Sequence, residues 1–278
     1  MSLAAFYAAH SKLIDQVGIN ALLALSLSVS LRAGQLALAQ AAFMGIAAYV
    51  GAIGATQSNW PLPLSLLAGA AAAAAAAFLL ALPIGRLRGV FLAIATIAFG
   101  EIARVVEINL KITGGAEGFS GIPNDADTRW IYGALALAAI AVAAFGWGSG
   151  RFALALAATR EDENAARGVG IDTAHVRLLA LVIGAVIAGV AGVLYAHANF
   201  FITPSDFGFG RMEQILVACV IGGVTSSLGA MIGAVVMTIL PESIRFLHDY
   251  REVTTGAILL AIIIFAPSGI AGLWQRRA

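Results

Sequence analysis

The sequence predicts an all-α integral membrane protein, a polytopic bundle of about eight transmembrane helices within a range of seven to ten. Of its 278 residues, 60% are hydrophobic and 11% are charged, whereas an ordinary soluble domain carries roughly 25% charged residues. A mean hydropathy of +0.93 represents more apolar surface than a soluble core of this size can hide. The apolar residues also gather in runs near the ~20 residues that a helix needs to cross a bilayer. These observations predict a single transmembrane domain over residues 1–278.

Eight apolar runs are candidates for the membrane helices. They are Leu13–Leu31, Gly34–Ala55, Leu62–Ile84, Val90–Leu110, Ile131–Trp147, Leu178–Ala198, Ile215–Leu240 and Thr254–Leu273. Their high alanine and glycine content suits helices that pack backbone to backbone in lipid, where hiding apolar surface gains little. A GC-rich genome that favours alanine codons would give the same composition, and the two readings are compatible.

Two of the runs are interrupted by polar residues and glycines, one near 34–45 and one near 222–233. Irregular backbone at membrane depth is tolerated only where protein or a water-filled cavity satisfies its polar groups. Interruptions at corresponding places in the two halves of a chain point to a translocation pathway. The sequence therefore predicts broken or re-entrant segments at these two places. The residues expected to line the pathway there are Gln35, Gln40, Gly222 and Gly223.

Basic residues in short loops orient the helices. Arginines lie between the third and fourth runs, between the fifth and sixth, and at the end of the chain, and loops of this kind face the cytosol. A single crossing by Ile215–Leu240 would place the last arginines on the wrong side. A break that divides this run into two elements removes the conflict.

The loop over about 150–177 carries a charged run followed by small residues. A short helix with a small-residue face and charged flanks can fit a groove on a partner protein, and Gly170 is placed to end such a helix. The alternative is a solvated loop whose charges keep it out of lipid. The residues singled out are Arg160, Glu161, Asp162, Glu163, Ala165, Ala166, Gly168 and Gly170.

Charged residues inside the fourth run are a third feature. Glu101 lies near the middle of that run, and Arg104 is spaced three residues from both Glu101 and Glu107. Charges at this depth cost at least about 2.5 kcal/mol each on insertion scales and face the interior of the bundle. Glu101 and Arg104 are therefore candidates either for a polar pathway lining or for a structural ion pair along one helix face.

Other functional classes find little support. The formal net charge of +1 gives no reason to expect nucleic-acid binding. The histidines and the single cysteine, Cys219, have no spacing typical of a metal site or of a catalytic nucleophile with its base. No G-x-x-x-x-G-K-[ST] phosphate loop is present. We therefore predict no enzyme activity, no metal and no cofactor in this chain.

Seven blocks of the sequence, taken in order, resemble permease subunits of ATP-binding-cassette importers of the branched-chain amino acid type, and together they cover nearly the whole chain. The loop block, ATREDENAARGVGID, is similar to the coupling-loop motif of that family. The blocks are Gly34–Ala52, Leu87–Val106, Thr113–Pro123, Ala158–Asp172, Leu178–Ala196, Gly222–Glu242 and Phe265–Leu273. The chain departs from the family pattern at Arg32–Ala33, Ala37 and Ala39, beside the expected pathway.

The resemblance implies a multi-subunit importer in the bacterial cytoplasmic (inner) membrane. Its partners would be a second homologous permease, two cytosolic ATPase subunits that hold ATP and Mg²⁺, and an extracytoplasmic binding protein. The expected cargo is a branched-chain or related amino acid. The same machinery with urea, short amides or small organic acids is an alternative, and an ion-coupled secondary carrier acting alone is a further one that leaves the 150–177 loop unexplained.

The coupling-loop interpretation makes a first prediction. Replacing Glu161 and Glu163 together by lysine is expected to prevent ATPase binding, because both charges lie in the proposed contact, while membrane insertion is unaffected. Co-purification of ATPase subunits and amino acid uptake measure the effect. Normal assembly and uptake would contradict the interpretation.

Overall fold

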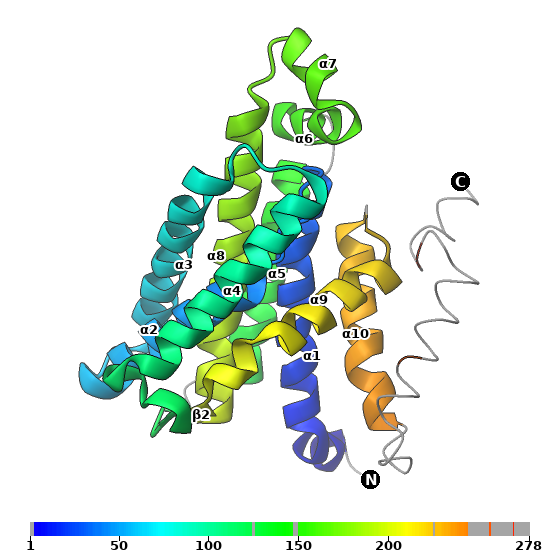
Figure 1. Ribbon diagram of the computed structural model, residues 1–278. Coiled ribbons are helices and arrows are strands. Elements are labelled where there is room, and N and C mark those ends of the chain that lie inside the picture. Colours follow the sequence, from blue (N-terminus) through cyan, green and yellow to red (C-terminus); the bar gives the residue numbers. More distant parts are fainter. Residues whose placement is uncertain are drawn as a thin grey trace.

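A computed structural model describes residues 3–123, 126–146, 150–224 and 226–243, together with Gly256 and Gly269. This part of the chain is almost wholly helical (Figure 1). The helices are α1 (Leu3–Arg32), α2 (Gln40–Gln57), α3 (Leu62–Ile84), α4 (Gly89–Asn109), α5 (Thr128–Gly146), α6 (Arg151–Glu161), α7 (Glu163–Gly168), α8 (Thr173–Asn199), α9 (Phe209–Gly222) and α10 (Ser227–Ser243).

Short irregular elements join the long helices at one end of the bundle. Three 3₁₀ turns lie there, η1 (Lys111–Thr113), η2 (Gly115–Glu117) and η3 (Pro204–Phe207). The strand β1 (Phe119–Ser120) pairs antiparallel with β2 (Phe201–Ile202). This small ladder ties the connection after α4 to the connection after α8, and it is the one departure from the all-α prediction among the described residues.

Four helices are long and apolar enough to cross a membrane: α1 from Ser11, α3, α4 and α8. The segment Pro204–Gly222 and the following Ser227–Leu240 pass the same test together but are bent by 119°. Helix α5 is a shorter apolar helix, and α2 is also short. A polytopic helical membrane protein is thus confirmed, whereas the expected count of eight is matched only in part. The predicted run Thr254–Leu273 falls outside the described residues except for Gly256 and Gly269.

The first helix break is shorter than predicted. The chain leaves α1 after Arg32, turns at Gly34 with a φ of +70°, and runs without helical structure to Ala39. The expected interruption at 34–45 is wrong from residue 40 onward, because α2 begins at Gln40 and already includes Gln40–Gly45. Alanine, methionine and phenylalanine follow Gln40 in the sequence, and no proline stops the helix there.

The second break divides one apolar run into two helices, as the orientation argument required. Helix α9 ends at Gly222, and α10 begins at Ser227, so the expected interruption at 222–233 is wrong beyond Ser226. Gly222 and Gly233 instead let α9 and α10 pack backbone to backbone: a Cβ on Gly222 would meet the carbonyl of Gly229, and one on Gly233 the carbonyl of Ala218. Close packing of small residues here sets the hairpin geometry.

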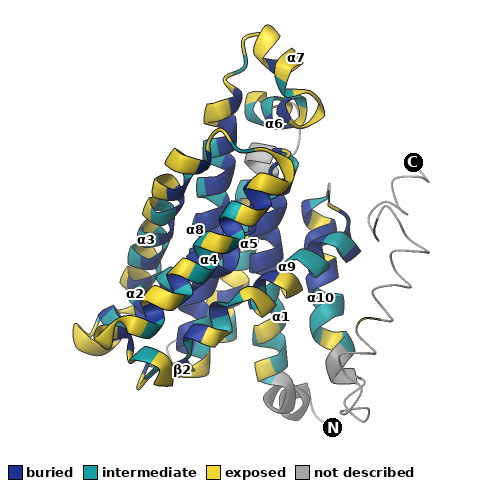
Figure 2. Cartoon of the chain, in the orientation of Figure 1, coloured by how far each residue is buried: buried dark blue, intermediate teal, exposed yellow. Residues whose placement is uncertain are grey.

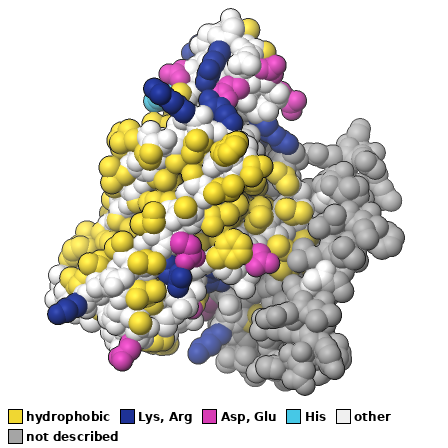
Figure 3. All heavy atoms as spheres, in the orientation of Figure 1, with side chains coloured by type: hydrophobic (Ala, Val, Ile, Leu, Met, Phe, Trp, Pro, Cys, Tyr) yellow, Lys and Arg dark blue, Asp and Glu magenta, His cyan; other side chains and the backbone are white. Residues whose placement is uncertain are grey.

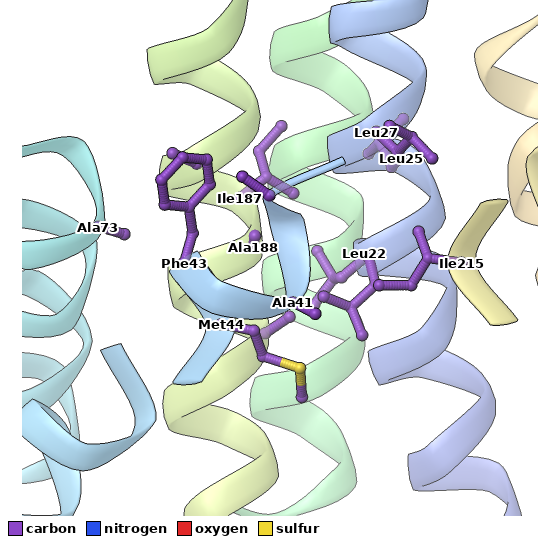
Figure 4. Close-up of a cluster of buried hydrophobic side chains, with 14 of the residues drawn as sticks. Leu22, Leu25, Leu27, Ala41, Phe43, Met44, Ala73, Ile187, Ala188 and Ile215 are labelled. Carbon is purple, nitrogen blue, oxygen red and sulfur yellow. The ribbon is translucent and has the colours of Figure 1, made fainter. Parts of the chain in front are cut away.

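Helix α2 occupies the centre of the bundle. It packs against α1, α3, α4, α8 and α9, and most of its residues are buried (Figure 2). Phe43 and Met44 from α2 meet side chains of the surrounding helices, including Leu22 of α1 and Ala188 of α8 (Figure 4). An almost entirely buried helix that begins inside the bundle must be enclosed by its neighbours, because its unpaired end cannot face lipid.

The surface of the described part has a broad apolar band and one strongly charged end. Figure 3 shows hydrophobic side chains over the body of the bundle and basic and acidic side chains gathered around α6 and α7. Exposed residues such as Phe91, Ile94 and Ile102 on α4 belong to the band. We call the charged end, which carries Arg88, Arg160 and the loop 150–177, the basic end. An apolar band between polar ends is the surface expected of a membrane-embedded bundle.

Close helix packing around α2 gives a second prediction. A Cβ on Gly192 of α8 would overlap the carbonyl of Met44 in α2, and backbone cannot turn aside as a side chain can. Gly192→Ala is therefore expected to cost roughly 1–3 kcal/mol, the range for overpacking, and to lower the unfolding temperature of the detergent-solubilised protein. Gly133→Ala is the control, since a Cβ there meets nothing within 4 Å. Equal unfolding temperatures for both variants would show that α2 and α8 are not in close contact.

Candidate functional site

The short helix α7 stands at the tip of the basic end, beyond the body of the bundle (Figure 1). Asp162 caps its start, since the side chain accepts hydrogen bonds from the backbone N–H groups of Asn164 at 2.8 Å and Ala165 at 3.0 Å. Gly170 follows its end with a φ of +85°. This left-handed residue allows the N–H of Ile171 to bond the carbonyl of Ala166, so the predicted role of Gly170 is confirmed.

The eight residues predicted for this loop do not all face the same way. Ala166 is buried against the rest of the chain, and Glu163 is only partly exposed. The remaining six are exposed on the outer surface of α6, α7 and the turn that follows: Arg160, Glu161, Asp162, Ala165, Gly168 and Gly170. Ala165 and Gly168 therefore form the accessible small-residue face of α7.

Glu163 is the centre of an ion-paired network inside the chain. Its carboxylate accepts two hydrogen bonds from Arg88, each 2.6 Å long. It also accepts from Arg167 at 2.7 Å and from Thr173 at 3.1 Å, and Arg177 lies 3.6 Å away. Bidentate arginine–carboxylate pairs are among the strongest polar contacts in proteins. Glu163 thus fastens α7 to the start of α4 and to the start of α8.

Arg177 extends this network to the first helix break. Its guanidinium donates to the carbonyl of Leu87 at 3.1 Å. With the amide of Gln35 in the orientation that satisfies both groups, Gln35 donates to the carbonyl of Arg177 at 3.1 Å and accepts from its Nε at 2.9 Å. Gln35 is thus a buried bridge between the break and α8, and its place on a pathway stays a prediction.

The charge state of Glu163 follows from its neighbours. Burial alone would raise the pKa of this carboxyl, but hydrogen bonds from Arg88 and Thr173 and the positive charges of Arg88 and Arg177 outweigh it, so the pKa lies below its ordinary value. A lowered carboxyl pKa means that the stabilising contribution is present at neutral pH and is lost as the pH falls through that value. The network is therefore intact under physiological conditions.

The extended chain of the first break is satisfied from neighbouring helices. The N–H of Leu38 donates to the hydroxyl of Thr96, in the middle of α4, at 2.8 Å. Gln40 is fully buried at the start of α2 and donates to Ser30 at 3.4 Å. No side chain caps the N-terminus of α2 or that of α9. The same is true of α3, α4 and α6, so the first N–H groups of these helices have no capping side chain.

The second break lies beside the end of α1. Gly223 follows α9 with a φ of +108°, and the hydroxyl of Ser227 lies 3.3 Å from that of Ser28 and 3.4 Å from Nη1 of Arg32. The predicted residues Gly222 and Gly223 therefore form the turn between α9 and α10. The two breaks meet at α1, on the side of the basic end.

A narrow cleft lies where α2, α4, η3 and α9 come together. Glu101 lines it and pairs with Arg104, whose Nη2 lies 2.8 Å from a carboxylate oxygen of Glu101; the structural ion pair considered from the sequence is thus present, at the cleft. The residues lining the cleft are Leu38, Ala41, Ala42, Ile97, Gly100, Glu101, Phe207, Gly208, Phe209 and Met212. A larger hollow of about 440 Å³ lies elsewhere, between Asp15 and Arg129 at the end opposite the basic end.

Glu107, on α4, is an acidic residue buried in the bundle. Its side chain is 5% exposed, and neither carboxylate oxygen has a hydrogen-bond partner among the described residues. The hydroxyl of Tyr49, on the adjacent face of α2, is likewise buried without a partner in the described part of the chain. The spacing in the sequence allowed Arg104 to pair with either Glu101 or Glu107, and in the structure it pairs with Glu101.

The described residues contain no group of three or more His, Cys, Asp or Glu side chains that could hold a metal ion. The polar groups that the fold gathers are instead of three kinds: the network around Glu163, the satisfied backbone of the two breaks, and the unpartnered pair of Glu107 and Tyr49. The Glu163 network joins α7 to the starts of α4 and α8, the second break lies beside α1, and only the third pair lies on α2 and α4.

Comparison with known proteins assigns this arrangement to a family. The sequence model of the family described as "Branched-chain amino acid transport system / permease component" matches residues 11–267. The chain belongs to this family. The matched region contains both helix breaks, the cleft and α7. No solved structure is significantly similar to the chain.

Individual relatives agree with this assignment. The branched-chain amino acid permease protein LivM of Salmonella typhimurium is 29% identical over 242 residues, 75% of this chain and 56% of that protein. The permease protein LivH of Escherichia coli K12 is 37% identical over 117 residues, 41% of this chain and 38% of its own length. The autoinducer 2 import permease protein LsrC of Yersinia pseudotuberculosis is 29% identical over 117 residues, 39% of this chain and 33% of that protein. The chain therefore spans about half the length of the LivM relatives it matches.

The network around Glu163 gives a third prediction. Glu163→Gln keeps the shape of the side chain but removes the charge that holds Arg88, Arg167 and Arg177 together, so α7 should open more readily. Hydrogen exchange of the α7 amides is expected to accelerate roughly tenfold or more, as for the loss of a charge-assisted hydrogen bond. Glu161→Gln, at an exposed position of α6, is the matched control. Equal exchange in the two variants would exclude a fastening role for Glu163.

Proposed function

We propose that this chain is the membrane-spanning permease subunit of an ATP-binding-cassette importer for branched-chain or related amino acids. Membership of the permease family carries the proposal. The fold agrees with it, because a transport protein needs a polar route through the membrane, and helices broken at membrane depth are where such routes run. The chain itself carries out no chemistry in this proposal.

The exposed face of α7 is the proposed contact with an ATPase subunit. It lies at the basic end, which the distribution of arginines assigns to the cytosol, and Ala165 and Gly168 leave room for a partner to approach. Two ATPase subunits would hold ATP and Mg²⁺. Glu163 does not belong to the contact surface; its role is to hold α7 against the bundle.

The apolar α4 surface beside the cleft is the proposed side of a second, homologous permease. A translocation pathway between the two subunits would then be bordered by α2, α4 and α9. A binding protein would deliver cargo at the end opposite α7, and the complex would lie in the bacterial inner membrane. LsrC, similar over 39% of the chain, is named for the import of a different cargo, autoinducer 2. Calorimetric ligand binding by the delivering protein would decide between an amino acid and the alternatives, urea, short amides or small organic acids.

The ATPase contact gives a fourth prediction. Ala165→Trp fills the exposed small-residue face of α7 without touching the Glu163 network, so it should prevent docking by steric exclusion. ATPase subunits are expected to co-purify with the unaltered chain. With the variant the amount of co-purified ATPase should fall at least tenfold, as for the disruption of a central contact. Gln57→Trp, exposed at the far end of α2, should retain them. If both variants retain the ATPase, α7 is not the docking site, and if the unaltered chain brings down no ATPase, the importer proposal fails.

A further inference from the structure

The buried carboxyl of Glu107 has no partner within the described residues, and this is costly. An unsatisfied buried charge or hydrogen-bonding group destabilises a protein by several kcal/mol in order of magnitude. The nearest basic residue on the same helix, Arg104, is engaged by Glu101 at 2.8 Å. An ionisable group kept unpaired inside a membrane bundle is a functional-site candidate.

A hydroxyl and an aromatic ring share the surroundings of Glu107. Oε1 of Glu107 lies 2.7 Å from the point where Gly45 of α2 would carry a Cβ, and Phe207 approaches the same point to 2.9 Å. The ring of Phe207 packs edge-on against Tyr49, with centroids 5.9 Å apart. Only a glycine at position 45 leaves this space open. A carboxylate, a phenol and an aromatic ring are the groups that proteins use to recognise an ammonium ion.

The cleft brings the starts of α2 and α9 together beside the Glu101–Arg104 ion pair. It is lined by Ala41 and Ala42 from the first turn of α2 and by Gly208 and Phe209 at the start of α9. Both helices exceed eight residues and neither start is capped by a side chain. Unpaired N–H groups at a helix start bind carboxylates. Apolar side chains of Leu38, Ile97 and Met212 also face the cleft.

The two features are close enough to serve one small ligand. Phe207 belongs to both, since it lines the cleft and approaches Gly45 beside Glu107. Along α2, Gly45 lies three to five residues beyond the N-terminal turn, a rise of roughly 5–8 Å.

We propose that Glu107, Tyr49 and the uncapped start of α2 form an intramembrane binding site for the zwitterionic head of an amino acid. The ammonium group bonds the Glu107 carboxylate and the Tyr49 hydroxyl, the carboxylate meets the N–H groups of the first turn of α2 and the start of α9, and an aliphatic side chain lies against Ile97 and Met212. The cleft is narrow in this structure, so binding requires α4 and the start of α9 to separate. The inference rests on the proposed function and names the cargo contacts within it.

The test uses the complete importer, with both permeases, the ATPases and the binding protein, reconstituted in nanodiscs and held with a non-hydrolysable ATP analogue. Retained radiolabelled L-leucine is measured after removal of free ligand. Glu107→Gln is expected to weaken retention roughly 10- to 100-fold, the effect of losing one charge-assisted hydrogen bond, and Tyr49→Phe less. Glu117→Gln, exposed at the same end of the bundle, should bind like the unaltered chain. Leucine should also slow the labelling of Glu107 by a hydrophobic carbodiimide, mapped by mass spectrometry.

Three results would overturn the site. Retention unchanged in Glu107→Gln would show that the carboxyl does not touch cargo. Loss of the second permease from the Glu107→Gln complex would show that Glu107 is a subunit contact. If Glu107→Leu is thermally more stable than the unaltered chain and retains leucine normally, the carboxyl of Glu107 has no role in binding cargo. A chain that assembles with no ATPase and imports no leucine counts instead against the proposed function.

Discussion

The rest of the structure depends on the requirement that irregular backbone inside the bilayer finds its hydrogen bonds within the protein. The segment after Arg32 runs without helical structure until Gln40, and lipid offers it nothing. Thr96 of α4 accepts from Leu38, and Gln35 exchanges two hydrogen bonds with Arg177 of α8. The break can exist only because α4 and α8 lie on either side of it. Helix α2 lies at the centre because its start, which follows the break, must also be shielded from lipid.

This requirement also explains the small residues of the surrounding helices. A helix that starts inside the bundle needs neighbours on every side, and they must come close. At Gly192 the backbone of α8 touches that of α2, and at Gly69 α3 approaches Val193 and the backbone of Ala47. Packing of this kind is a main source of helix association in lipid. The alanines and glycines thus allow the close helix packing of this fold, whether or not codon usage also favours them.

The sequence predicted the features that are local along the chain and missed those that are not. Apolar runs, both breaks, the charged loop and the terminating role of Gly170 each leave a pattern within a few residues. The pairing of Glu163 with Arg88, 75 positions away, leaves none. The case of Arg104 shows the limit most clearly, because the i,i+3 rule serves Glu101 and Glu107 equally. Its Cδ lies 3.3 Å from the point where Gly208, in a distant segment, would carry a Cβ, and its guanidinium pairs with Glu101.

Some buried polar groups of the bundle are fully hydrogen-bonded and others are not. The first kind suits a structural role, and the second kind suits contact with cargo. At the basic end one carboxylate, Glu163, serves three arginines and a threonine, so little is left to bind anything else. Such a group can hold α7 in place but cannot recognise a cargo. Further along α4, Glu107 and Tyr49 have no partner within the described residues. A permease must offer its cargo hydrogen bonds that the protein does not already use, because a satisfied site gains nothing from the ligand. Unpaired groups beside two helix starts without side-chain caps meet this condition, whereas the saturated carboxylate of Glu163 does not.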